Sequence, residues 1–127
     1  MPDEITLTIP RDPGFHGVAF LVLGGLASRL GLTVENLEDL EIALNSILDR
    51  LVLQSGEITV RMAVRDGELV THVGPLARSV LQEIEREQDD VLTLRRVLDS
   101  TVDDVHVEGD WVSLTKKVTV GGVAAGG

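Results

Sequence analysis

The sequence predicts an α+β fold, a two-layer sandwich in which one mixed or antiparallel sheet of about five strands is covered on one face by helices. Two patterns carry this prediction. Apolar and polar residues alternate in some stretches, as in half-buried strands, and apolar residues recur every three or four positions in others, as in amphipathic helices. The predicted order is strand, helix, helix, hairpin, two helices, hairpin. With 127 residues, 43% of them hydrophobic, the chain is long enough to build one core.

The N-terminal part of the chain is predicted to form a strand and a helix. Residues 5–9 alternate isoleucine or leucine with threonine, and Pro10 is expected to end this strand. Residues 15–30 keep helical spacing, although Gly24 and Gly25 each cost about 1 kcal/mol relative to alanine inside a helix. A close contact with another helix would explain these two glycines.

The second helix is predicted over residues 35–53, because its apolar positions fall on one stripe at about 100° per residue. These positions are Leu37, Leu40, Leu44, Ile47, Leu48 and Leu51. Thr33 is the expected N-cap, with Asn36 three residues later in place of the usual glutamate or glutamine.

The remaining elements follow from the same two patterns. A first hairpin joins strands at residues 58–64 and 69–73, and a second joins strands at residues 102–107 and 111–120. Between the hairpins, two shorter helices are predicted over residues 76–86 and 91–100. The sequence thus predicts a single domain over residues 1–120 and a flexible tail of glycine, alanine and valine over residues 121–127.

Composition excludes several classes of function. The 21 acidic and 11 basic residues give a formal net charge of -10, which argues against binding to nucleic acid or to an anionic membrane surface. There is no cysteine, so disulfides and thiolate chemistry are excluded, and a cytoplasmic location is expected. The apolar run at residues 18–27 is too short to span a membrane.

Two segments give the chain a specific resemblance. The sequences PGFHGVAFLVLGGLASRLGLTVENLEDLEIAL at residues 13–44 and VDDVHVEGDWVSLTKKV at residues 102–118 resemble the anti-sigma-factor serine kinases of the GHKL (histidine-kinase-like) ATPase superfamily. The resemblance covers nearly the whole chain and implies the histidine-kinase-like ATPase fold. It also implies protein partners, namely a sigma factor or a small anti-anti-sigma domain, and self-association as a possible homodimer.

The catalytic helix of that family corresponds here to residues 35–53. In the family this helix carries a glutamate that acts as a base and, four residues later, an asparagine that holds Mg²⁺. Alignment on EDLEIAL places Ser46 at the glutamate and Arg50 at the asparagine. Serine is not a base at neutral pH, and arginine brings a cation where a cation should bind. The resemblance therefore implies that both positions are vestigial.

The other nucleotide-binding motifs of the family are also altered. The aspartate that reads adenine corresponds to His72, so that only Gly74 of its motif remains. The glycine-rich lid corresponds to residues 89–96, which contain no glycine and begin with two aspartates that would repel phosphate. The arginine that contacts the partner from the first helix corresponds to Phe20. We therefore expect no catalytic residue, no bound metal and no cofactor, and we expect a pseudo-enzyme that acts by binding proteins.

Three alternatives remain open. Glu41 and Asn45 have the same four-residue spacing as the catalytic pair, so an altered site built on them would make the chain an active ATP- and Mg²⁺-dependent serine kinase. Ser46 and His72 could form a nucleophile and base, although no motif places them together. Finally, an apolar cavity beside Ser46 and His72 would indicate a sensor of small molecules.

Overall fold

The computed structural model describes residues 4–51, 56–85, 93–117, 119–120 and 123–124. Its main sheet has five strands in the order β1-β2-β3-β5-β4, and every neighbouring pair is antiparallel. The strands are β1 (Glu4–Pro10), β2 (Glu57–Arg65), β3 (Glu68–Gly74), β4 (Asp104–Glu108) and β5 (Trp111–Lys117). The short strands β6 (Thr119–Val120) and β7 (Val123–Ala124) pair with each other in a separate sheet.

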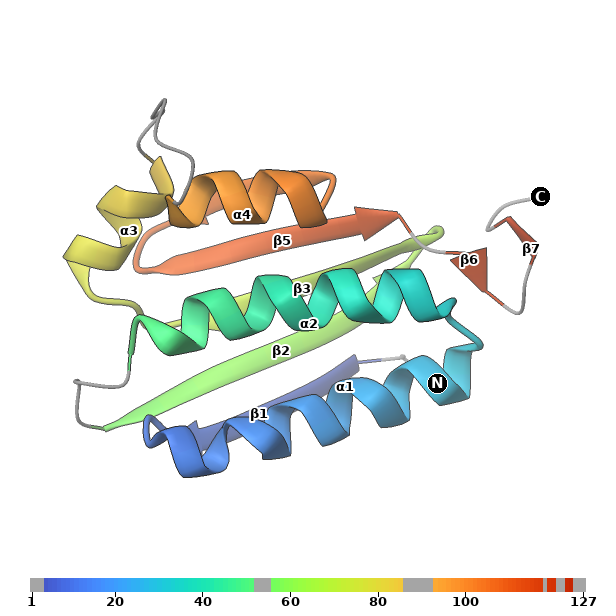
Figure 1. The fold of residues 1–127 in the computed structure, drawn as a ribbon, viewed down its shortest axis with the longest axis horizontal. Coiled ribbons are helices and arrows are strands. Elements are labelled where there is room, and N and C mark those ends of the chain that lie inside the picture. The colour runs from blue at the N-terminus through green and yellow to red at the C-terminus, as the bar shows by residue number, and fades with distance from the viewer. Residues whose placement is uncertain (1–3, 52–55, 86–92, 118, 121–122, 125–127) are drawn as a thin grey trace.

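The helices form the second layer of the molecule. They are α1 (His16–Leu30), α2 (Val34–Asp49), α3 (Arg78–Glu85) and α4 (Leu94–Thr101), and a short 3-10 helix, η1 (Pro13–Phe15), precedes α1. Figure 1 shows α1, α2 and α4 side by side in front of the strands, with α3 at one end of the sheet. The predicted two-layer α+β fold is therefore confirmed, with an entirely antiparallel main sheet.

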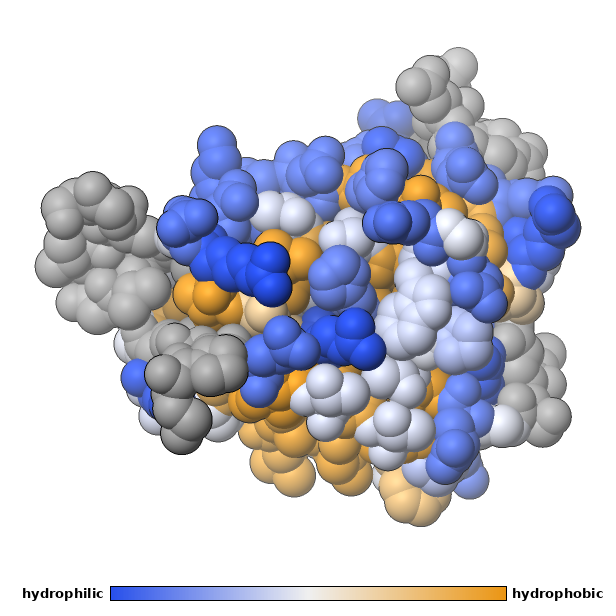
Figure 2. All heavy atoms as spheres, turned by 180° about the vertical axis from the view of Figure 1, so that it is seen from behind, coloured by the Kyte–Doolittle hydropathy of each residue, from blue (hydrophilic) through white to orange (hydrophobic). Residues whose placement is uncertain are grey.

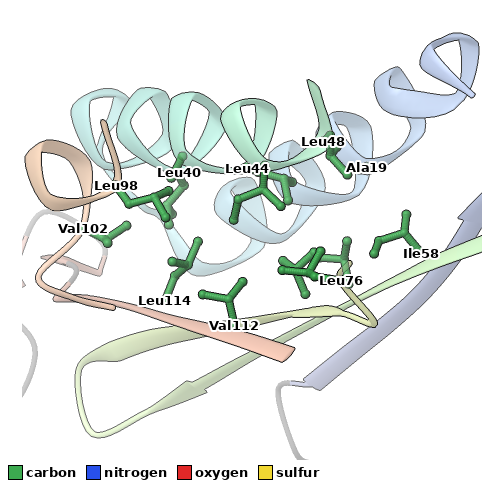
Figure 3. Close-up of a cluster of buried hydrophobic side chains, with 14 of the residues drawn as sticks. Ala19, Leu40, Leu44, Leu48, Ile58, Leu76, Leu98, Val102, Val112 and Leu114 are labelled. Carbon is green, nitrogen blue, oxygen red and sulfur yellow. The ribbon is translucent and has the colours of Figure 1, made fainter. Parts of the chain in front are cut away.

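The core lies between the helices and the sheet. Alternate strand residues such as Val60, Leu69 and Leu114 point toward the helices and are at most 1% exposed. The leucine stripe of α2 packs onto them, and Figure 3 shows Leu40, Leu44 and Leu48 directed at the strands. This burial explains why α2 forms as predicted, since most of the stability of a short helix comes from packing of its apolar face.

The start of α2 also follows the prediction. Thr33 has an extended backbone, and its hydroxyl oxygen accepts a hydrogen bond of 3.1 Å from the backbone N–H of Asn36. This bond satisfies one of the N–H groups that the first turn of a helix leaves without a partner. The predicted N-cap is therefore confirmed.

Pro10 ends β1, as predicted, and lies opposite Glu57, because an edge strand tolerates a proline at its end. Other predicted boundaries were wrong. The helix predicted over residues 35–53 ends at Asp49, with Arg50 as its C-cap, although the apolar pattern continues because Leu51 is still buried. Helices predicted to start at residues 76 and 91 start at Arg78 and Leu94, and residues 52–53, 86 and 91–92 lie outside the described residues.

The predicted tail is described only in part. Val123–Ala124 forms β7 and pairs with β6, whereas residues 121–122 and 125–127 lie outside the described residues. The domain boundary at residue 120 and the flexibility of the tail therefore remain predictions. No helix among the described residues is long and apolar enough to cross a membrane.

The close helix contact expected at the two glycines of α1 is not made within the described part of the chain. No heavy atom lies within 4 Å of a Cβ built on Gly24 or Gly25, so neither glycine is needed for packing within the described part of the chain. Two large apolar side chains of the same helix, Val18 and Leu21, are 38% and 77% exposed. The outer side of α1 is therefore an apolar, small-residue surface that no described element covers.

The face of the sheet opposite the helices, here called the open face, is mainly polar. One row across it consists of Thr6, Arg61, His72, Ser113 and His106, which lie opposite one another in the strand register. Figure 2 shows this side of the molecule, where hydrophilic and intermediate residues dominate the centre and hydrophobic residues gather along the lower edge, on the side where Figure 1 shows α1.

Candidate functional site

The two positions predicted to be vestigial, Ser46 and Arg50, lie near the C-terminal end of α2. Ser46 is half-buried, and its hydroxyl donates a hydrogen bond of 2.8 Å to the carbonyl oxygen of Ile42 in the preceding turn. Such back-bonding is common for a serine inside a helix. The hydroxyl is therefore engaged with its own helix, and no described residue acts on it as a base.

Arg50, at the end of α2, connects three helices through Glu83. Its Nη2 atom lies 3.0 Å from Oε2 of Glu83 on α3, and its Nε atom lies 3.3 Å from the same oxygen. That oxygen also accepts a hydrogen bond of 3.0 Å from the backbone N–H of Leu94, the first residue of α4. The N-terminus of a helix attracts anions, and here a carboxylate of the chain itself takes that place.

A second arginine holds α4 against α3. Nη1 of Arg95 donates to the carbonyl oxygen of Ile84 at 3.0 Å, and Nε of Arg95 lies 2.9 Å from Oδ1 of Asp99. Together with Arg50 and Glu83, this arginine ties α2, α3 and α4 into one arrangement. In the family that the chain resembles, the asparagine at the position of Arg50 would hold Mg²⁺. The residues present do not fit that role, because a guanidinium has only donor groups and a positive charge.

Gly74 has a packing role. A Cβ atom built on Gly74 would lie 2.3 Å from Cδ2 of Trp111, which is closer than real contacts allow. The indole of Trp111 thus lies directly on the backbone of Gly74. The one glycine that remains of the adenine motif is therefore required by a neighbouring side chain of the open face.

His72 lies on the opposite side of the sheet from Ser46. It alternates along β3 with Thr71 and Val73, which face the helices and are 4% and 0% exposed. Its side chain lines a hollow of about 310 Å³ on the open face, together with Arg61, Glu108, Trp111, Val112 and Ser113. The sheet separates the two residues, so the possible Ser46 and His72 pair, and a cavity shared by both, were wrong. Strict alternation in β3 was the sequence signal that could have revealed this.

The rival pair of Glu41 and Asn45 lies on α2, one helical turn apart. Nδ2 of Asn45 donates to Oδ2 of Asp49 at 3.3 Å, and Glu41 is half-buried. This is the ordinary pairing of polar residues four positions apart on a helix. The structure brings the two residues onto the same side of the helix, as their spacing requires, and the described residues add no further polar partner to Asn45.

The lid region falls largely outside the described residues. Residues 86–92, which include both aspartates of the predicted lid, are not described, so the prediction for that segment remains a prediction. Among the residues that the structure does describe, no group of three or more acidic or histidine side chains could hold a metal ion. His16 is 7% exposed, and its Nε2 atom has no hydrogen-bond partner within the described part of the chain.

Phe20, at the position of the partner-contacting arginine, is half-buried and packs against the core. The two-layer fold is the one that the resemblance to the serine kinases implies. Curated proteins with similar sequences support this resemblance. The chain is 32% identical over 94 residues to the serine-protein kinase RsbW of Listeria monocytogenes, an alignment that covers 69% of the chain and 60% of that relative.

Two further relatives carry the same name. The chain is 36% identical over 73 residues to the serine-protein kinase RsbW of Bacillus velezensis, covering 53% of the chain and 46% of the relative. It is 26% identical over 128 aligned positions to that of Oceanobacillus iheyensis, covering 86% and 81%. The predicted resemblance to serine kinases of this type is confirmed. The chain spans only about half of the first of these relatives, and no protein-family model matches it.

Proposed function

We propose that this chain is a regulatory protein that retains the serine-kinase scaffold and acts by binding other proteins rather than by transferring phosphate. The observation that carries this proposal is the contact of Arg50 with Glu83 and, through it, with the N-terminus of α4. A phosphate or Mg²⁺ ion at this place would have to displace a partly buried ion pair. It would then meet a guanidinium where the metal-binding amide belongs.

The proposal includes the absence of a nucleotide cofactor. ATP with Mg²⁺ needs a base, a metal ligand and an adenine contact, and the residues at these positions are Ser46, Arg50 and His72. The hydroxyl of Ser46 is bonded to its own helix, Arg50 is bonded to Glu83, and His72 faces the other side of the sheet. Ser46 and Arg50 thus contact groups of the chain itself, and His72 lies on the side of the sheet away from both, which favours loss of the nucleotide site.

The surface proposed for protein binding is the outer side of α1, defined by Gly17, Val18, Leu21, Gly24 and Gly25. Its two large side chains are exposed, and a Cβ built on any of the three glycines meets no atom within 4 Å. A partner helix could therefore approach the backbone of α1 closely while burying Leu21. Exposed apolar patches of this kind are typical of interaction sites.

By resemblance, the partner is a sigma factor or a small anti-anti-sigma domain in the bacterial cytoplasm, and a second copy of the chain would be a further partner. The contact would differ from that of the family, because the arginine expected on α1 is replaced by Phe20, which packs inward. The apolar outer side of α1 would supply the binding energy in place of that arginine.

Isothermal titration calorimetry with Mg-ATP tests the nucleotide part of the proposal. We expect no saturable heat up to millimolar Mg-ATP, because Arg50 and Glu83 already satisfy each other. Binding in the micromolar range would overturn the pseudo-enzyme proposal. The serine-protein kinase RsbW of Listeria monocytogenes is a suitable positive control for the titration.

An active kinase is the second candidate, favoured by the names of the relatives and by the spacing of Glu41 and Asn45. It predicts transfer of phosphate from ATP to a partner domain, and loss of that transfer in Asn45→Ala. Asp49→Ala is the matched control, because it removes the hydrogen-bond partner of Asn45 while leaving the amide in place. Absence of labelling together with absence of ATP binding would exclude this candidate.

A further inference from the structure

The open face of the sheet carries a hollow that the proposed function does not use. Its volume is about 310 Å³, at the lower end of the range for ligand sites, and its lining comes from β2, β3, β4 and β5. A smaller hollow of about 160 Å³ shares Arg61 and His72 with it and continues the depression toward Glu4 and Arg65. Arg61 and His72 therefore line both hollows.

We propose that this depression is a binding site for a small aromatic carboxylate that also bears a hydrogen-bond donor. The site lies on the opposite side of the sheet from the vestigial nucleotide positions of α2. The proposal does not depend on whether the chain binds ATP. Its argument rests on three features of the larger hollow, namely a row of donors, a fixed aromatic ring and one carboxylate, that of Glu108.

The row of donors favours an anion. Arg61, His72 and Ser113 lie directly opposite one another on β2, β3 and β5, so their side chains emerge side by side. No described residue accepts a hydrogen bond from any of these three side chains, and the guanidinium of Arg61 is permanently charged. The chain as a whole has a net charge of -10, so a row of donors that includes an arginine differs from its overall acidic character. A carboxylate would satisfy the guanidinium and one neighbouring donor together.

The aromatic ring favours a planar ligand. The guanidinium of Arg61 lies 5.8 Å from the centre of the Trp111 ring, within the range of a cation–π interaction. The indole packs closely against Gly74 on the sheet. The position of its ring is therefore fixed before a ligand binds. A ligand ring that packs on the part of the indole that the guanidinium leaves open would place an attached carboxylate near Arg61. Because the ring is held before binding, little ordering is needed when the ligand arrives.

The carboxylate of Glu108 determines which group the other end of the ligand can carry. Glu108 lies across from Trp111 in the strand register and is the only acidic residue among those that line the larger hollow. A negative group there would repel a second anionic group of the ligand and would accept a hydrogen bond from a hydroxyl or amine. The arrangement thus selects a ligand with an anion at one end and a donor at the other.

Para-hydroxybenzoate is a probe with these features, and Trp111, the one tryptophan of the chain, is a built-in reporter. In a ¹H–¹⁵N NMR titration of the full chain, we expect the single indole N–H signal to move in a saturable manner. Acetate, which lacks the ring, and phenol, which lacks the carboxylate, should each bind at least tenfold more weakly. No movement with para-hydroxybenzoate, or an equal response to acetate, would overturn the proposal.

Variants locate the site. Arg61→Gln should weaken binding of para-hydroxybenzoate at least tenfold, and Glu108→Gln should reduce the preference for para-hydroxybenzoate over benzoate. Arg96→Gln, which removes an exposed arginine of α4 on the helix side, is the matched control and should leave the affinity unchanged. Circular dichroism would confirm that each variant is folded. Unchanged binding by a folded Arg61→Gln variant would contradict the assignment.

Discussion

At the residue scale, Gly74 and Trp111 depend on each other. The indole lies where a side chain on residue 74 would be, and the same indole lines the hollow of the open face. Gly74 was predicted to be the remnant of an adenine motif, and the sequence could not show that a tryptophan 37 positions later would require the same glycine. That requirement arises only when β3 and β5 pair.

Replacing Gly74 tests this dependence. We expect Gly74→Ala to lower the free energy of unfolding by about 2 kcal/mol, because the added Cβ overlaps the indole and the ring must move. Urea unfolding measures the loss of stability. The fluorescence emission of Trp111 should shift to longer wavelength as the ring moves away from residue 74 into solvent. Gly17→Ala is the control, because a Cβ there meets no atom within 4 Å. Equal stability of the two variants would contradict the close contact.

Arg50 supplies a second prediction at this scale. We expect Arg50→Met to lower the free energy of unfolding by about 1 kcal/mol, a modest value because both side chains of the pair with Glu83 remain about one-third exposed. A double-mutant cycle with Glu83→Gln, followed by urea unfolding, measures the coupling between the two residues. Arg96→Met serves as the control, and a coupling near zero would show that the pair does not hold the helices together.

At the element scale, periodicity predicted most of the fold and failed at the ends of elements. The stripe of α2 identified a real helix, but Leu51 extended the pattern past its end, since a buried residue after a helix looks like one more turn. The alternation in β3 directs Leu69 and Val73 into the core. The same alternation places His72 on the open face, so this part of the site could have been predicted from sequence. The contact between Arg50 and Glu83 could not, because 33 positions separate the two residues.

At the element scale, we predict the effect of replacing a glycine on the outer side of α1. Gly24→Ala should stabilise the chain by up to about 1 kcal/mol, because alanine favours the helix and the added Cβ meets no neighbour. Thermal unfolding monitored by circular dichroism measures the gain. If a partner helix approaches this surface closely, the same variant should bind that partner more weakly despite its greater stability. A loss of stability would instead show that Gly24 is required by the fold of the chain itself.

At the scale of the whole molecule, the two sides of the chain have different chemical characters. The outer side of α1 is apolar, whereas the open face, seen in Figure 2, is mainly polar. The Arg61 and Trp111 pair lies on that open face. Two distinct surfaces would allow the proposed protein partner and the proposed small ligand to be bound at the same time. Loss of catalysis would leave both surfaces intact, since neither uses the vestigial positions of α2.

Self-association provides the test at this scale. If a second copy binds through α1, Leu21→Asp should weaken the association at least tenfold, because Leu21 is 77% exposed in the single chain and a buried carboxylate would lack a partner. Analytical ultracentrifugation over a range of concentrations measures the dissociation constant. Thr6→Asp, which adds the same charge to the exposed edge strand on the open face, is the matched control. Equal weakening by both variants would point to the net charge of -10 as the cause, and no weakening by Leu21→Asp would exclude α1 from the interface.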